Sequence, residues 1–148
     1  MFALTSANER GPLTAAVPRG RVASGRMTAR TLAGLQAAGR IVLGGGLVAA
    51  PSLLAGGWVG SVADKPGGRA LATGLGARDL AIAAGTLAAL RNGHGARPWV
   101  RAGMLADAAD VVATLRARDG LPPVAVPAVA VLAGGSVALG AYLHRELR

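Results

Sequence analysis

Residues 70–90 read ALATGLGARDLAIAAGTLAAL, an apolar run that contains only two charges, Arg78 and Asp79. About 20 predominantly apolar residues are long enough to cross the hydrocarbon core of a bilayer as one helix. An isolated charge near the bilayer centre is costly, so charged residues inside such a run are expected to meet partners on neighbouring helices. The run therefore predicts one transmembrane helix of a bundle.

Three further apolar runs lie on either side of this one, at residues 32–55, 98–117 and 124–143. Together they predict an all-α integral membrane bundle of about four transmembrane helices, formed by residues 31–148. The run at 98–117 is apolar only between Arg101 and Arg116, so a tilted, interfacial or re-entrant helix is the alternative there. Glycine pairs and a proline predict a loop over residues 56–68.

Composition favours a membrane protein over a soluble one. The chain is 52% hydrophobic and 16% charged, whereas about a quarter of the residues of a typical soluble domain are charged. Its 23 glycines and many alanines suit helices that approach one another closely in lipid. The chain has no cysteine, and neither histidine lies near an acid pair at ligand spacing, so we expect no metal, cofactor or catalytic site.

The net charge of +9 raises the question of a nucleic-acid partner. The arginines flank the apolar runs instead of lining one helix face, so we expect no nucleic acid. Residues 1–30 are basic and are expected to form a flexible cytoplasmic tail, with an organelle transit peptide as the alternative. The preference for arginine over lysine, with much alanine and glycine, suggests a GC-rich bacterial genome and hence the bacterial cytoplasmic membrane.

The flanking charges also predict the orientation, because basic residues are enriched on the cytoplasmic side. With both termini inside, ten basic residues face the cytoplasm and four face outward. The inner set is Arg10, Arg19, Arg21, Arg26, Arg30, Arg91, Arg97, Arg101, Arg145 and Arg148, and the outer set is Lys65, Arg69, Arg116 and Arg118. Aromatic residues at run ends, as in an interfacial belt, are Trp58, Trp99 and Tyr142.

Five ionisable residues lie inside the predicted spans: Arg40, Arg78, Asp79, Asp107 and Asp110. Arg78 and Asp107 are expected at similar depth, because each lies nine residues from an outer flanking arginine. Arg40 is the expected partner of Asp79 or Asp107. Arg78 and Asp79 are neighbours that point about 100° apart on a helix, so we expect them to have different partners.

Two arginines against three aspartates leave one surplus negative charge in this group. Either one aspartate is protonated, or a hydroxyl, an indole or an external cation compensates it. A functional interpretation is a proton or cation relay, or a polar cavity for a small substrate. The structural alternative is a closed ion-pair network that fixes helix register.

Small residues recur every four positions in two of the runs and predict helix-packing faces. The first stripe is Ala77, Ala81, Gly85 and Ala89, and the second is Ala130, Gly134 and Ala138.

The stretch Gly76-Ala77-Arg78-Asp79 resembles the central Gly-x-Arg-Asp motif of an uncharacterised family of small, four-span, actinobacterial-like membrane proteins. Trp99, the segment Ala106-Asp107-Ala108-Ala109-Asp110 and an Arg-x-x-x-Gly pattern at residues 40–44 extend the resemblance over residues 35–145. It implies a membrane bundle and supplies no activity.

These patterns together predict a non-enzymatic membrane protein that contacts lipids and either a membrane-protein partner or further copies of itself. The leading hypothesis is an accessory or structural subunit of a larger membrane complex. The alternative is a small oligomeric proton- or cation-coupled transporter that uses the Arg/Asp group.

Overall fold

The computed structural model describes residues 27–147. Within this range the chain is all-helical and without strands, which confirms the all-α part of the predicted fold class. Its elements are α1 (Ala29–Ala49), α2 (Pro51–Val59), the 3-10 helix η1 (Gly60–Asp64), α3 (Pro66–Arg91), α4 (Arg97–Ala117), the 3-10 helix η2 (Arg118–Gly120) and α5 (Ala125–Glu146).

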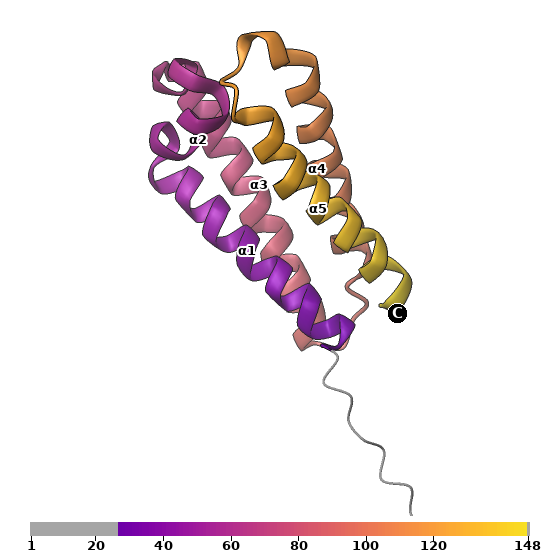
Figure 1. Ribbon diagram of the computed structural model, residues 1–148. Coiled ribbons are helices and arrows are strands. Elements are labelled where there is room, and N and C mark those ends of the chain that lie inside the picture. The colour runs from indigo at the N-terminus through magenta and orange to yellow at the C-terminus, as the bar shows by residue number, and fades with distance from the viewer. Residues whose placement is uncertain (1–26, 148) are drawn as a thin grey trace, which may run out of the picture.

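The long helices form two antiparallel pairs, α1 with α3 and α4 with α5 (Figure 1). The start of α1 lies beside the end of α3, where the Arg30 guanidinium donates to the Leu90 carbonyl. Ala33 of α1 and Leu147, just beyond α5, share one apolar cluster. The start of α1, the α3–α4 loop and the end of α5 therefore lie at one end of the bundle, called here the closed end.

Helix α1 begins inside the segment that the sequence assigns to the basic tail. Thr28 caps it, because its side-chain oxygen accepts a hydrogen bond from the Thr31 amide at 3.2 Å. Residues 1–26 of the predicted tail lie outside the described part of the chain, so only the end of that prediction is corrected.

The predicted span over residues 32–55 is wrong as one continuous helix. Ala50 leaves the helical conformation, with φ −140° and ψ 65°, and separates α1 from α2. It precedes Pro51, and a residue before proline is disfavoured in the α region because its backbone clashes with the proline ring. Pro51 itself opens α2, since its fixed φ and missing N–H suit the first turn.

The loop predicted over residues 56–68 is also corrected, because most of this segment is helical in α2, η1 and the start of α3. Gly60 separates α2 from η1 with φ 63°, a conformation that glycine adopts without strain. The other helices agree closely with their predicted ranges: α3 contains 70–90, α4 matches 98–117 and α5 covers most of 124–143.

Helices α1 and α3 approach closely where two glycines face each other. A Cβ atom added at Gly76 would lie 2.5 Å from the Gly44 carbonyl oxygen and 2.9 Å from the Leu47 Cβ. The buried residues of α1 are spaced alternately by four and three positions, and those along the facing side of α3 follow the same rhythm. They are Ala33, Ala37, Arg40, Gly44 and Leu47 on α1, and Ala72, Gly76, Asp79, Ala83 and Thr86 on α3.

The stripe predicted on α3 is therefore not the face that packs on α1. Ala77 and Ala81 are exposed, Gly85 is half-buried against the Trp99 ring, and Ala89 is buried. Four residues turn an α-helix through about 400°, so a strict spacing of four drifts about 40° per step around the axis. Alternating steps of four and three average 3.5 and keep to one face.

The stripe predicted on α5 also lies mostly off the packed face. Ala130 and Ala138 are exposed and Gly134 is half-buried. The close approach of α5 to α4 occurs instead at Gly140, where an added Cβ would run into the Met104 side chain.

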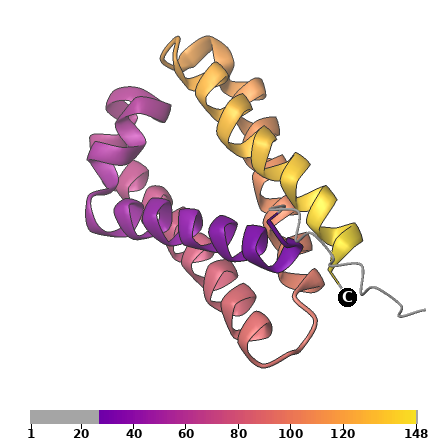
Figure 2. The same cartoon turned by 60° about the horizontal axis from the view of Figure 1, so that its bottom comes forward.

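The two helix pairs are in close contact at the closed end and diverge toward α2 (Figure 2). Contact between α1 and α5 is short compared with the α4–α5 contact. It includes the Gln36 side-chain amide, which donates to the Ser136 backbone oxygen at 3.1 Å. Two of the described helices, α1 and α5, are long and apolar enough to cross a membrane.

Candidate functional site

The five charged residues singled out in the sequence form one continuous chain of ion pairs. Arg40 donates from Nη1 to Asp79 Oδ1 at 3.1 Å and from Nη2 to Asp107. Arg78 donates from Nη2 to the same Asp79 oxygen at 3.1 Å, and it also binds Asp110. The order Asp107–Arg40–Asp79–Arg78–Asp110 alternates in sign and joins α1, α3 and α4.

The chain has a buried end and an accessible end. Arg40, Asp79 and Asp107 expose only 8%, 4% and 6% of their surface. Arg78 and Asp110 are half-buried. A buried charge is stabilised only by paired, hydrogen-bonded partners, so the Arg40 end is where the loss of a partner costs most.

The accessible end is a two-pronged pair. Arg78 Nη1 lies 3.0 Å from Asp110 Oδ1, and Nη2 lies 2.8 Å from Oδ2. The planar guanidinium matches both carboxylate oxygens at once, which fixes the geometry between α3 and α4 more firmly than a single contact.

Two details differ from the sequence prediction. Arg40 binds both of its candidate partners, Asp79 and Asp107, instead of one. Arg78 does not avoid its neighbour, because its Nε and Nη2 both lie within 3.3 Å of Asp79 Oδ1. The 100° separation of the two Cβ directions is overcome by the length of the arginine side chain, which curls back along the helix.

Sequence reasoning missed the glycine that lets Arg40 cross to α4. A Cβ added at Gly103 would lie 2.8 Å from Arg40 Nη2, so a larger residue there would force the guanidinium to shift from the position in which it reaches Asp107. Its position four residues before Asp107, on the same helix face, is the signal that would have identified it.

Two polar residues beside the ion-pair chain were also missed. Gln36 Nε2 donates to Ser136 Oγ at 2.9 Å, and that oxygen lies 3.4 Å from Arg40 Nη2. They link α1 to α5 at the edge of the charged group. Gln36 lies one turn before Arg40, and Ser136 is the one serine in the apolar run 124–143, so both carried a local signal.

Helix α2 is tied to α4 by a second polar connection. Trp58 Nε1 donates to Thr114 Oγ1 at 2.9 Å, and Thr114 in turn donates to the Asp110 carbonyl at 2.7 Å. Trp58 is half-buried, with its N–H satisfied inside the protein, instead of serving simply as an interfacial anchor as its place in the sequence predicted.

The ion-pair chain forms the floor of a cavity of about 700 Å³, called here the cleft. All five charged residues line it, together with Trp58 and Ser136. Its walls are mostly apolar and come mainly from α1, α2 and α5, with Leu75 from α3. The larger apolar side chains of those three helices are Leu43, Leu47, Leu54, Val129, Leu132 and Leu139. Its lining residues on α1 and α5 belong to the two helices whose backbones diverge in Figure 2.

The arrangement provides an apolar space above a floor with one surplus negative charge. Neither histidine lines the cleft, and no group of three or more metal-ligating side chains forms within residues 27–147. Such a space suits an apolar helix, or an amphiphile whose polar end meets the charges.

Comparison with known proteins found no match to this chain among family models, curated proteins or solved structures. The resemblance to the four-span membrane family remains a prediction.

Proposed function

We propose that this chain is a multi-pass protein of the bacterial cytoplasmic membrane that acts as an accessory subunit, with α5 as the helix that a partner contacts. The observation that carries the proposal is the unburied apolar surface of α5. Only 11% of its most apolar 18-residue window is buried inside the chain. A core helix of a soluble protein would bury most of such a window.

The exposed apolar surface of the other helices also supports the proposal that the protein lies in a membrane. The corresponding window of α1 is 28% buried. Large apolar side chains that are strongly exposed on these helices include Val42, Leu53, Leu71 and Leu105. Exposed large apolar side chains thus occur on each of the helices α1 to α5, which suits an outer surface in contact with lipid.

The charges in the middle of α3 and α4 are compatible with spanning, because they are paired with each other and with Arg40. They are Arg78, Asp79, Asp107 and Asp110. At 1.5 Å per residue, the 26 residues of α3 and the 21 of α4 reach about 39 Å and about 32 Å. Both lengths match the hydrocarbon core of a bilayer, about 30 Å thick.

The closed end is proposed to face the cytoplasm. It carries the exposed residues Arg30, Arg91, Arg97, Arg101 and Arg145. The opposite end carries Lys65, Arg69, Arg116 and Arg118 in the described chain. The closed end thus carries more of these basic residues than the opposite end, as the positive-inside rule expects of a cytoplasmic side.

The accessory role rests on small residues that find no intramolecular partner. Ala130 and Ala138 of α5 are exposed, as are Ala77 and Ala81 of α3. Small residues allow helix backbones to approach closely in lipid, where packing replaces the hydrophobic effect as the driving force.

The test is a gentle-detergent pull-down of the tagged protein from its native membrane, with mass spectrometry of stoichiometric companions. We expect a companion that Ala130→Leu/Ala138→Leu removes, because the larger side chains block close approach. Ala109→Leu/Ala113→Leu is the matched control, since both alanines are exposed on α4. Recovery of the wild-type chain as a pure homo-oligomer contradicts the accessory role.

A second candidate is a cation- or proton-coupled carrier, favoured by the surplus aspartate charge on the floor of the cleft. Four helices are few for alternating access, so a carrier would be expected to work as a dimer. Asp107→Asn is then expected to abolish cation-dependent flux in proteoliposomes while the protein still inserts. The exposed Asp119→Asn serves as the control. Unchanged flux, or no flux in the wild type, dismisses this candidate.

A further inference from the structure

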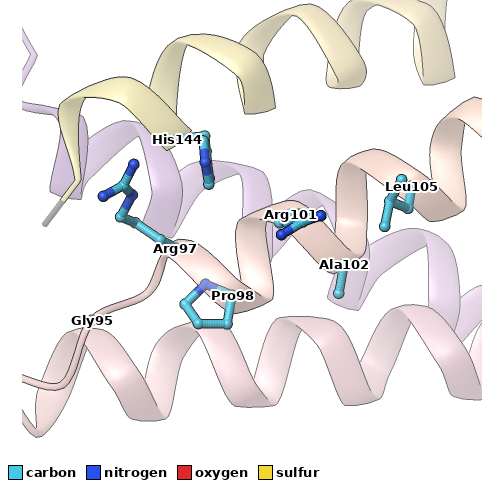
Figure 3. A pocket seen from close by; sticks show the side chains of 7 residues that line it. All are labelled: Gly95, Arg97, Pro98, Arg101, Ala102, Leu105 and His144. Atoms are coloured by element: carbon cyan, nitrogen blue, oxygen red, sulfur yellow. The ribbon is translucent and has the colours of Figure 1, made fainter.

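Another cavity, of about 660 Å³, lies at the closed end between the start of α4 and the end of α5. Figure 3 shows Arg97 rising from the start of α4 toward α5, with His144 pointing back from α5 and Arg101 one turn further along α4. The lining thus combines two guanidinium groups with an imidazole. It is called here the basic cavity.

The two arginines present their charge to this space without a carboxylate partner. Within residues 27–147, neither Arg97 nor Arg101 meets a carboxylate within 4.0 Å, whereas Arg40 and Arg78 are both fully engaged. Residues four apart share a helix face, so both guanidinium groups can address one anion. The positive end of the α4 dipole adds to the attraction.

His144 also lines the basic cavity, and one of its ring nitrogens is unsatisfied. Its Nδ1 is buried and has no hydrogen-bond partner in the described part of the chain. Buried polar atoms normally have a partner, and one that lacks it requires an explanation. Because this nitrogen is enclosed, the imidazole would have to rotate before Nδ1 could meet a phosphate oxygen bound beside the two guanidinium groups.

The basic cavity continues into an apolar surface along α4. Beyond Arg101 its lining consists of Ala102 and Leu105, and Leu105 is exposed. The lining therefore changes from charged to apolar on going from the closed end toward the middle of the bundle. A polar head at the end of a helix, followed by an apolar strip along it, is the layout of a phospholipid.

We propose that the basic cavity binds the headgroup phosphate of an anionic phospholipid of the cytoplasmic leaflet, with an acyl chain along Ala102 and Leu105. Basic pockets between membrane helices on the cytoplasmic side are suited to acidic lipid headgroups. The inference rests on the proposed membrane location and cytoplasmic closed end, and it adds a ligand class and a site.

The experiment uses the full chain purified in detergent, titrated with short-chain phosphatidylglycerol and observed by native mass spectrometry. Arg97→Gln/Arg101→Gln is expected to weaken binding at least tenfold more than Arg91→Gln/Arg145→Gln. The second pair removes the same charge from exposed positions of the closed end that do not line the basic cavity. Phosphatidylcholine of equal chain length is expected to bind far more weakly.

Equal losses in the two double variants would overturn the site, because they would show attraction to a general positive potential. Binding of inorganic phosphate alone with the affinity of the lipid would overturn the lipid as its source. Failure of the membrane proposal is seen separately, as protein that stays in the soluble fraction after cell lysis. Lipid binding that depends on Arg97 and Arg101 supports the proposal.

Discussion

The two ends of the bundle are built differently. At the closed end one apolar cluster combines residues of both helix pairs, including Ala33, Ala89, Val100 and Leu143. At the α2 end the buried cluster contains Leu47, Ala55, Ala63 and Ala72, so among the described residues it draws on α1, α2, η1 and α3 alone. The ion-pair chain lies where the shared apolar core stops.

This contrast explains how the cleft stays open without the pairs separating. Arg40 and Arg78 hold α4 against α1 and α3 at the point where apolar contact has ended. The two helix pairs are thus held together by ion pairs on the floor of the cleft and by apolar side-chain packing at the closed end. The comparison predicts large losses for substitutions in the ion-pair chain and the closed end, and small losses in the cleft walls.

The largest effect is expected for Arg40→Met. It leaves the buried carboxylates of Asp79 and Asp107 without their shared partner, and breaking a buried pair from one side costs about 3–5 kcal/mol. Thermal unfolding in detergent, followed by circular dichroism, measures the loss. Arg116→Met is the control, because it also removes one positive charge but from an exposed position. It is expected to change the unfolding temperature little.

A combined variant distinguishes the cost of the unpaired buried charges from the cost of the lost arginine packing. Arg40→Met with Asp79→Asn and Asp107→Asn removes the unpaired charges and is expected to recover most of the lost stability. An Arg40→Met protein as stable as the wild type would show that the ion-pair chain does not hold the helix pairs together.

The next effect tests the closed end. Leu143 is fully buried, and Leu143→Ala is expected to cost about 3 kcal/mol through lost contacts and the remaining cavity. Leu132 lines the cleft and is 67% exposed, so Leu132→Ala is expected to cost under about 1 kcal/mol. Equal losses of unfolding free energy for the two variants, measured by chemical unfolding, would contradict the difference in packing between the closed end and the cleft wall.

A smaller loss is expected where α1 and α3 touch. Gly76→Ala places a Cβ against the Gly44 backbone, which cannot move aside cheaply, and is expected to cost about 1–3 kcal/mol. Gly74→Ala meets nothing within 4 Å and is expected to be neutral or stabilising by up to about 1 kcal/mol. In thermal unfolding, Gly76→Ala is expected to lower the midpoint and Gly74→Ala to leave it unchanged or raise it, and two equal shifts would contradict the close contact.

The smallest effect concerns the link between α2 and α4. Trp58→Phe keeps most of the ring but removes the hydrogen bond to Thr114, at an expected loss of about 1 kcal/mol. Tyr142→Phe, at an exposed position, is the comparison and is expected to leave the unfolding midpoint unchanged. A Trp58→Phe midpoint equal to that of the wild type would remove this link from the account.

The helices were largely predictable because their signals are local. Pro98 and the flanking arginines defined α4 almost to the residue, and apolar length defined α3 and α5. The end of α1 was missed because the apolar run continues past Ala50, and only the effect of Pro51 on the preceding residue breaks the helix there.

The charged residues of the site were visible because a charge in an apolar run is conspicuous, and the structure joins all five. The packing faces were less predictable, since in a chain rich in alanine and glycine small residues recur at spacing four on several sides of a helix. The cleft had no sequence signal, because it depends on how far the helix pairs diverge.

The proposed four-span bundle, with its closed end in the cytoplasm, can be tested by cysteine labelling in spheroplasts. The chain has no cysteine, so single cysteines can be introduced without background. We predict that Asp119→Cys, in η2, reacts with a membrane-impermeant maleimide from outside. Asn92→Cys, in the α3–α4 loop, is expected to react only after permeabilisation. Labelling of both from the same side, or recovery of the protein in the soluble fraction, would contradict the account.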